Sequence, residues 1–166
     1  MDVAYEPGAW QPLYLMVGGA AAVLTGLIFV AVSLHPNPIL SNRFHRGRAE
    51  SSLLALMAVV LISGAVLVPS QPLPVLGTEV AMLALTTHLA TLRGLLHVPA
   101  RRHRRESLEL LVGLGAATLG FLGGVSLIVH WGGGLWLLLP AGATALGTAV
   151  WNAWRLMVEV ATEPAL

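Results

Sequence analysis

Polar side chains within the apolar segment 75–96 are the first candidates for chemistry. Glu79, Thr86 and Arg93 are seven residues apart, so a helix would carry them on one face. His88 falls on the opposite side, near the middle of the segment. An ionisable group at membrane depth is a functional hypothesis, because it is expensive to bury there. Glu79 and Arg93 lie near the segment ends, where long side chains reach water. For His88 we favour a hydrogen bond to a neighbouring helix, and an ion or proton role stays open.

A second polar set lies in the segment 135–160. Its members recur at helical spacing and form one stripe: Thr144, Thr148, Asn152, Arg155 and Glu159. Such a stripe avoids lipid and faces other helices, a water path or, in its last part, the cytoplasm. Arg155 and Glu159 can pair at i, i+4. We favour hydrogen bonding between helices, with a pore wall as the alternative.

Signatures of catalysis and metal binding are missing from the sequence. It has no cysteine and no HExxH, GxSxG or P-loop pattern. An intramembrane protease would need His88 beside a serine such as Ser63 or Ser126. The sequence alone does not show whether either serine lies next to His88 in the fold. Four further histidines show no tight ligand spacing: His35, His45, His97 and His103. We therefore expect no enzyme activity, no metal site and no cofactor.

The elements that carry these residues must suit a bilayer. Of the 166 residues, 56% are hydrophobic and 10% are charged, whereas a soluble domain has about 25% charged residues. A membrane helix needs about 20 apolar residues. Five segments qualify: 10–34, 49–68, 75–96, 107–129 and 135–160. The expected fold is all-α, a polytopic transmembrane bundle of these five spans that occupies residues 1–166 as a single domain.

Arginine alternates from loop to loop, and this predicts the orientation of the chain. Arg43, Arg46 and Arg48 follow the first segment and the run 101–105 follows the third, whereas the other two loops are uncharged. The positive-inside rule then places the N-terminus outside and the C-terminus in the cytoplasm. The tryptophans agree with an aromatic belt, in an outer and an inner group: Trp10, Trp131 and Trp136, then Trp151 and Trp154.

The basic run RRHRR at 101–105 is explained as an orientation signal. Its arginines also suit contact with anionic lipid headgroups, and the two roles can coexist: Arg101, Arg102, Arg104 and Arg105. A nucleic-acid patch would need interleaved aromatic residues and a recognition fold, and neither accompanies the run. The expected partners therefore include the lipid bilayer and exclude nucleic acid.

Small residues recur every four positions in three segments and predict close contacts between helices. The three sets are Gly18, Ala22 and Gly26; Ala116, Gly120 and Gly124; and Ala141, Ala145 and Ala149. Most of these faces should pack within the chain. Five helices seldom use all of them internally, so we expect a homo-oligomer.

Three stretches carry a family resemblance: residues 17–40, LVPSQP at 67–72 and WNAWRLMVEV at 151–160. In them the chain resembles a group of small actinobacterial multi-pass membrane proteins of unknown function, some labelled as modulators of the membrane protease FtsH. The resemblance implies a helical protein of a bacterial inner membrane. It implies no catalytic residues.

Two functions from different classes follow as expectations. We favour a non-enzymatic inner-membrane protein that acts in interaction or regulation, oligomerises with itself, or binds another membrane protein. The alternative is an ion or small-solute channel lined by the polar stripe of 135–160 and by His88. Against the channel, no acidic ring lies near the middle of the membrane. A transporter is disfavoured because the sequence has no inverted repeat with broken helices.

Overall fold

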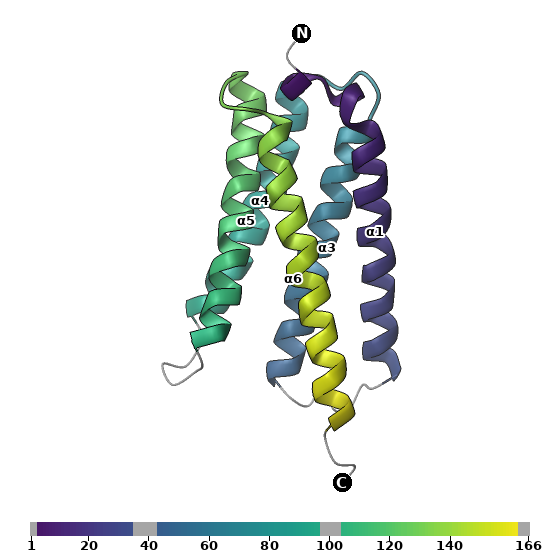
Figure 1. Ribbon diagram of the computed structural model, residues 1–166. Helices are drawn as coiled ribbons and strands as arrows, with labels where there is room; N and C mark the ends of the chain where they lie inside the picture. Colours follow the sequence, from purple (N-terminus) through teal and green to yellow (C-terminus); the bar gives the residue numbers. More distant parts are fainter. Residues whose placement is uncertain (1–2, 35–42, 97–103, 163–166) are drawn as a thin grey trace.

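The computed structural model describes residues 3–34, 43–96 and 104–162, and gives the backbone alone at 43–45, 48, 94–96, 104–107, 109, 156–157 and 159–162. The described chain forms a short 3-10 helix and five α-helices. These are η1 (Val3–Tyr5), α1 (Pro7–Leu34), α3 (Arg43–Leu67), α4 (Leu73–Leu96), α5 (Arg104–Val129) and α6 (Leu135–Thr162). The expected all-α architecture is confirmed, with one helix for each predicted segment. Consecutive α-helices run in opposite directions along the bundle (Figure 1).

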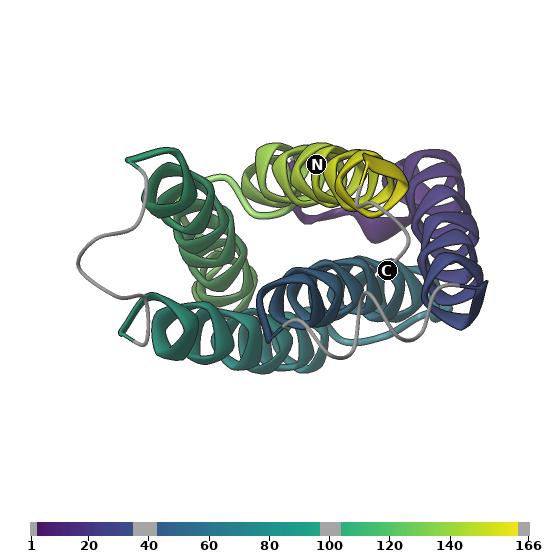
Figure 2. The same ribbon diagram turned by 90° about the horizontal axis from the view of Figure 1, so that it is seen from below.

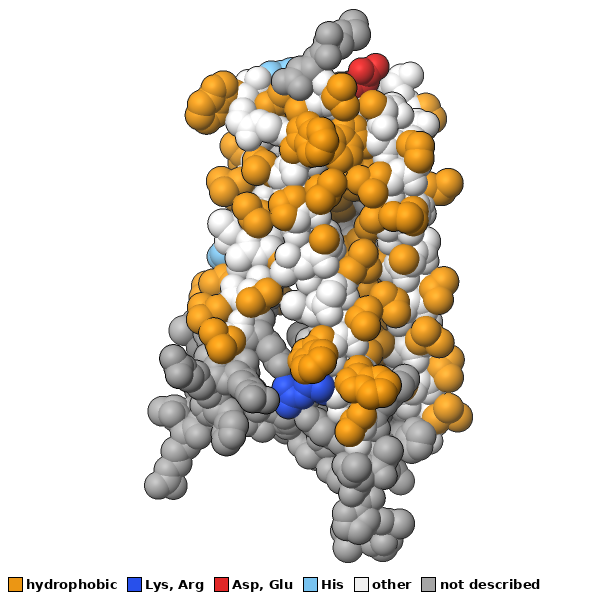
Figure 3. Space-filling model, viewed as in Figure 1, with side chains coloured by type: hydrophobic (Ala, Val, Ile, Leu, Met, Phe, Trp, Pro, Cys, Tyr) orange, Lys and Arg blue, Asp and Glu red, His pale blue; other side chains and the backbone are white. Residues whose placement is uncertain are grey.

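Four of the helices are long and apolar enough to cross a membrane. The segments are Pro7–Leu34, Ala49–Leu67, Leu73–Arg93 and Leu110–Val129. Within the described residues α6 is not among them, since threonines, glycines and Asn152 interrupt its apolar sequence. Large apolar side chains cover the outside of the bundle (Figure 3), as with Leu15 and Phe29, which are 67% and 66% exposed. Soluble proteins rarely expose such continuous apolar surface, so the chain is a helical membrane protein.

The helices form a closed arrangement when viewed along the bundle. In Figure 2, α4 and α5 make one side, α1 makes the opposite side, and α3 and α6 lie between them. The most extensive contact joins α4 to α5, and the next joins α1 to α3. α6 packs against both α5 and α3, so it is an integral part of the bundle.

Buried apolar residues gather in two clusters at different heights. The upper core, at the end that carries η1, draws on all five α-helices: Trp10, Tyr14, Val66, Leu76, Val80, Leu127, Leu135 and Leu138. The lower core of the described chain draws on α1, α3 and α6: Ala21, Ile28, Leu56, Val59 and Ala149. The α4–α5 pair is thus tied to the other helices mainly at its upper end, and its lower end diverges from α6 (Figure 1).

The small residues of α5 serve the contact with α4. A Cβ at Gly124 would lie 2.6 Å from the Ala81 nitrogen and 2.8 Å from the Gly77 oxygen, so the two backbones touch there. A Cβ at Gly120 would lie 3.3 Å from that of Ala84. Because a side chain at either glycine would force the helices apart, this face is used within the chain as expected.

The other two small-residue faces differ from each other. On α6, Ala141 and Ala149 are buried. On α1, Gly18 packs against Ser63 of α3, whereas Ala22 and Gly26 are exposed. The inward face of α1 is formed by other residues, among them Ala21 and Ile28. The four-residue spacing on α1 thus identified only one inward small residue.

Trp10 lies at the upper end of the bundle beside Trp136, but its side chain is buried within the protein and does not face lipid. The side chain is 6% exposed and belongs to the upper core. Its indole Nε1 donates to the Val3 oxygen at 2.7 Å, and its ring meets Trp136 edge-on at 4.7 Å. The N-terminal residues fold over Trp10 and bury it. The other four tryptophans are exposed: Trp131, Trp136, Trp151 and Trp154.

Candidate functional site

His88 lies half-buried at the contact between α4 and α5. Its Nδ1 is 3.4 Å from the Thr118 hydroxyl oxygen. That hydroxyl donates its single proton to the Leu114 oxygen at 2.8 Å. The His88 imidazole on α4 and the Thr118 hydroxyl on α5 thus lie within hydrogen-bond reach of each other. The arrangement is a hydrogen bond between two helices, which is the interpretation the sequence favoured.

The other polar residues predicted on α4 point away from the bundle. Glu79, Thr86 and Arg93 are all exposed, which agrees with their expected common face. Glu79 accepts a hydrogen bond from Gln71 Nε2 at 2.8 Å at the upper end of the helix. The Thr86 hydroxyl donates to the Leu83 oxygen at 2.8 Å. Within one chain these residues lie on the outer surface and do not line the interior.

The polar stripe of α6 borders the interior of the bundle. Thr144, Thr148, Asn152 and Arg155 are half-buried, and the side chain of Glu159 lies outside the described residues. The Thr148 hydroxyl donates to the Thr144 oxygen at 2.9 Å. Asn152 Oδ1 is buried and has no hydrogen-bond partner in the described chain. The stripe therefore brings one unpartnered acceptor into an otherwise apolar contact.

Two serines on α3 add to the buried polar groups, and sequence reasoning missed one of them. Ser52 and Ser63 are 3% and 2% exposed and lie eleven residues apart on one face of the helix. Ser63 had been considered as a partner of His88, but it packs against Gly18 of α1. Ser52 was overlooked because Ser51, Ser52 and Ser63 do not recur at the three- or four-residue spacing of a helical face.

The upper end of the bundle holds a polar network that we call the N-terminal clasp, formed by Tyr5, Ser126 and the turn between α5 and α6. The Ser126 hydroxyl accepts from the Gly134 nitrogen at 2.8 Å and donates to the Trp131 oxygen. The Tyr5 hydroxyl accepts from the Gly133 nitrogen at 3.1 Å. Ser126 is therefore committed to the turn and is not paired with His88.

The turn in the clasp depends on glycine. Gly132 and Gly133 have φ of 96° and 111°, values that L side chains rarely adopt. A Cβ at Gly134 would collide with the Ala4 oxygen. The run WGGG thus allows η1 to lie directly against the turn, and the ring of Tyr5 stacks on His130 at 5.7 Å.

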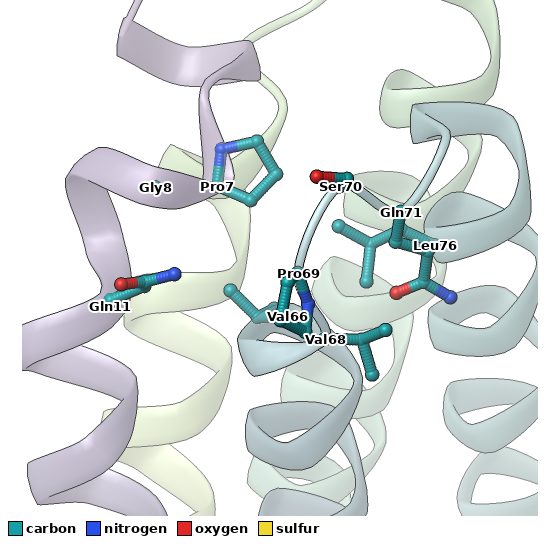
Figure 4. A pocket seen from close by; sticks show the side chains of 9 residues that line it. All are labelled: Pro7, Gly8, Gln11, Val66, Val68, Pro69, Ser70, Gln71 and Leu76. Atoms are coloured by element: carbon teal, nitrogen blue, oxygen red, sulfur yellow. The ribbon is translucent and has the colours of Figure 1, made fainter.

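A small hollow opens at the upper end between α1, the end of α3 and the start of α4 (Figure 4). Its volume is about 170 Å³, below the roughly 300–1,000 Å³ of typical ligand pockets. Its lining is uncharged: Pro7, Gly8, Gln11, Val66, Val68, Pro69, Ser70, Gln71 and Leu76. This size and lining do not suit a cofactor.

The basic residues at the lower end are described in part. Arg101, Arg102, His35, His97 and His103 lie outside the described residues, as do the side chains of Arg104, Arg105 and His45. Arg46 Nε donates to Glu50 Oε1 at 2.8 Å, and this carboxylate raises the pKa of Arg46. Over the described ranges, no three His, Asp or Glu side chains gather closely enough to hold a metal ion.

No protein-family model, curated protein or solved structure matches this chain.

Proposed function

We propose that the chain is an integral protein of a bacterial inner membrane that crosses it five times, with the N-terminus outside and the C-terminus in the cytoplasm. α6 supports the fifth crossing, because it packs on α3 and α5 and extends along the bundle beside the four candidate spans (Figure 1). The alternation of arginine between loops supports the orientation. On the face drawn in Figure 3, acidic (red) atoms lie at the upper end and basic (blue) atoms lie toward the lower end.

Within that membrane the protein acts as a non-enzymatic homo-oligomer in interaction or regulation. The observation that carries this proposal is the outer face of α1. Of the four candidate spans, α1 has the smallest buried share, 11% of its most apolar window. Gly19 and Gly26 are exposed there with nothing near their missing Cβ atoms, and Ala22 lies between them. Small residues allow a second helix backbone to approach closely.

Substitution at this face tests the proposal. Gly26→Leu should lower the oligomeric fraction in bilayers, measured by cross-linking or by single-molecule photobleaching, because the larger side chain separates the two α1 helices. Gly115→Leu on α5 is the matched control, since Gly115 is also exposed and has open space around it. Equal assembly of both variants and the unmodified chain would remove α1 as the interface.

Another membrane protein is a second kind of partner for the same face. The resemblance to proteins labelled as modulators of a membrane protease makes such a protease one candidate. Regulation of a partner needs no catalytic group in this chain, in keeping with an interaction role.

The alternative function, an ion or small-solute channel, rests on the α6 stripe. Asn152 supplies a buried unpartnered oxygen, and Thr148 lies one turn above it. His88 lies at the α4–α5 contact beside Thr118, which is exposed. It would therefore line a channel only if a second chain packed against this surface of α4 and α5 and enclosed a path there.

Ion flux in liposomes separates the two functions. We expect no selective flux from the folded, oligomeric protein. A channel would instead give a selective flux that both Thr148→Leu and His88→Ala alter, since these groups would line the path. Thr25→Leu on α1 is the control, because its half-buried hydroxyl bonds only its own helix at the Ala21 oxygen.

A further inference from the structure

The hollow at the upper end, between α1, the end of α3 and the start of α4, has room for more than a single water molecule. Its volume of about 170 Å³ compares with the roughly 150 Å³ of an engineered protein cavity that binds benzene. A molecule of about five to seven non-hydrogen atoms therefore fits the hollow. Its lining determines which chemistry such a molecule needs.

Gln71 gives the wall of the hollow an acceptor without a partner. Its side-chain oxygen, Oε1, is buried and makes no hydrogen bond in the described chain. Its Nε2 donates to Glu79 Oε2 at 2.8 Å, and an ionised carboxylate only accepts, so the amide cannot turn round without losing this bond. In Figure 4 the oxygen lies on the side of the hollow and the nitrogen on the far side. A ligand here must therefore bring an N–H or O–H donor.

The other polar groups of the lining are adaptable. Gln11 of α1 extends its amide toward the hollow from the opposite side, and the Ser70 hydroxyl lies at the upper edge (Figure 4). Both side chains are exposed, and either can donate or accept as a ligand demands. A molecule with one donor and one acceptor can thus be bonded from both sides.

The remaining lining disfavours charge and suits a compact apolar body. Val66 and Leu76 belong to the wall and are 1% and 0% exposed. None of the nine lining residues is charged, so an ionic ligand would lose water without gaining a counter-ion. Water bound against apolar walls is poorly ordered, and an apolar group that displaces it gains affinity.

We propose that this hollow binds a small neutral amide, of the size of a lactam ring, from the side of the membrane at which the upper end lies. The amide N–H donates to Gln71 Oε1, the carbonyl accepts from Gln11 or Ser70, and the hydrocarbon part lies against Val66 and Leu76. The site lies within one chain, so it depends on neither the proposed oligomer nor ion conduction.

Two ring compounds of equal size test the site. The lactam 2-pyrrolidinone has an N–H donor, and the lactone γ-butyrolactone has an oxygen in its place. Titrated into the full chain in lipid nanodiscs, 2-pyrrolidinone should shift the amide resonance of Gly8, a lining residue, in a saturable way. The lactone should bind about tenfold more weakly, the usual effect of one hydrogen bond. Equal affinities, or shifts that stay linear with concentration, would overturn the proposal.

Gln71→Met is the matched variant, since methionine keeps the length of the side chain and removes the acceptor. It should weaken 2-pyrrolidinone about tenfold and leave γ-butyrolactone unchanged. Thr78→Val on α4 is the control and should change neither, because its exposed hydroxyl bonds the Pro74 oxygen of its own helix. Unchanged affinity of Gln71→Met for the lactam would contradict the site. If Gln71→Met fails to fold, the comparison of the two compounds on the unmodified chain decides.

Discussion

At the scale of the residue, His88 is a link between two helices. Its Nδ1 lies 3.4 Å from the Thr118 hydroxyl of α5, and that hydroxyl donates to the Leu114 oxygen of its own helix at 2.8 Å. A contact of this kind between α4 and α5 gives the residue a structural role.

A double-mutant cycle measures the His88–Thr118 bond. We expect His88→Leu and Thr118→Val to couple by about 0.5–1 kcal/mol in the free energy of unfolding, typical of hydrogen bonds between membrane helices. Thr86→Val is the control and should not couple to His88, because its hydroxyl bonds the Leu83 oxygen of its own helix. Additive effects of the first pair would mean that the bond contributes nothing.

Individual contacts were the least predictable level from sequence. The period of a helix gives the face on which a residue lies, but not the helix that this face meets. The sequence therefore grouped Glu79, Thr86 and Arg93 correctly on one face. The sequence could not predict that Trp10 is buried, because the contact between η1 and the indole is a tertiary contact. Nor could it show that Ser52 is buried, because burial depends on which helices pack around that face of α3.

At the scale of the element, the α4–α5 pair is the tightest unit of the fold. Gly77 and Gly124 allow direct backbone contact, which no larger residue permits. The helices themselves were predictable from their apolar runs, four of which also have the length and hydropathy that a bilayer requires. Of the small-residue faces, those of α5 and α6 pack inside, whereas that of α1 is mainly exposed.

Two alanine substitutions on α5 test this contact. Gly124→Ala should destabilise the chain by about 1–3 kcal/mol, the usual cost of overpacking, because its Cβ would meet the backbone of α4. Gly115→Ala should instead stabilise the helix by about 0.5–1 kcal/mol, since that position is open and alanine favours the helix. Unfolding in detergent measures both, and equal effects would contradict the close approach of α4 and α5.

At the scale of the whole molecule, the absence of cysteine makes topology directly measurable. Ser70→Cys in the α3–α4 turn should react with a membrane-impermeant reagent from outside intact cells. Thr162→Cys at the end of α6 should react only after permeabilisation if α6 makes the proposed fifth crossing. Labelling of both from outside would contradict that crossing.

The arginine run provides the control for orientation. Neutral replacement of Arg101, Arg102, Arg104 and Arg105 removes the charge that would retain this loop in the cytoplasm in the proposed orientation. We expect mixed labelling of Ser70→Cys in that background. Unchanged labelling would show that the remaining arginines set the orientation alone.

The two cores also determine the outline that the protein presents to lipid. All five helices meet in the upper core, whereas the lower core of the described chain unites α1, α3 and α6. The bundle is accordingly wider at its lower end (Figure 1). A wedge of this kind occupies more area in one leaflet than in the other. In the proposed orientation the broad end lies in the cytoplasmic leaflet, so crowding of these molecules would favour a membrane whose convex side faces the cytoplasm.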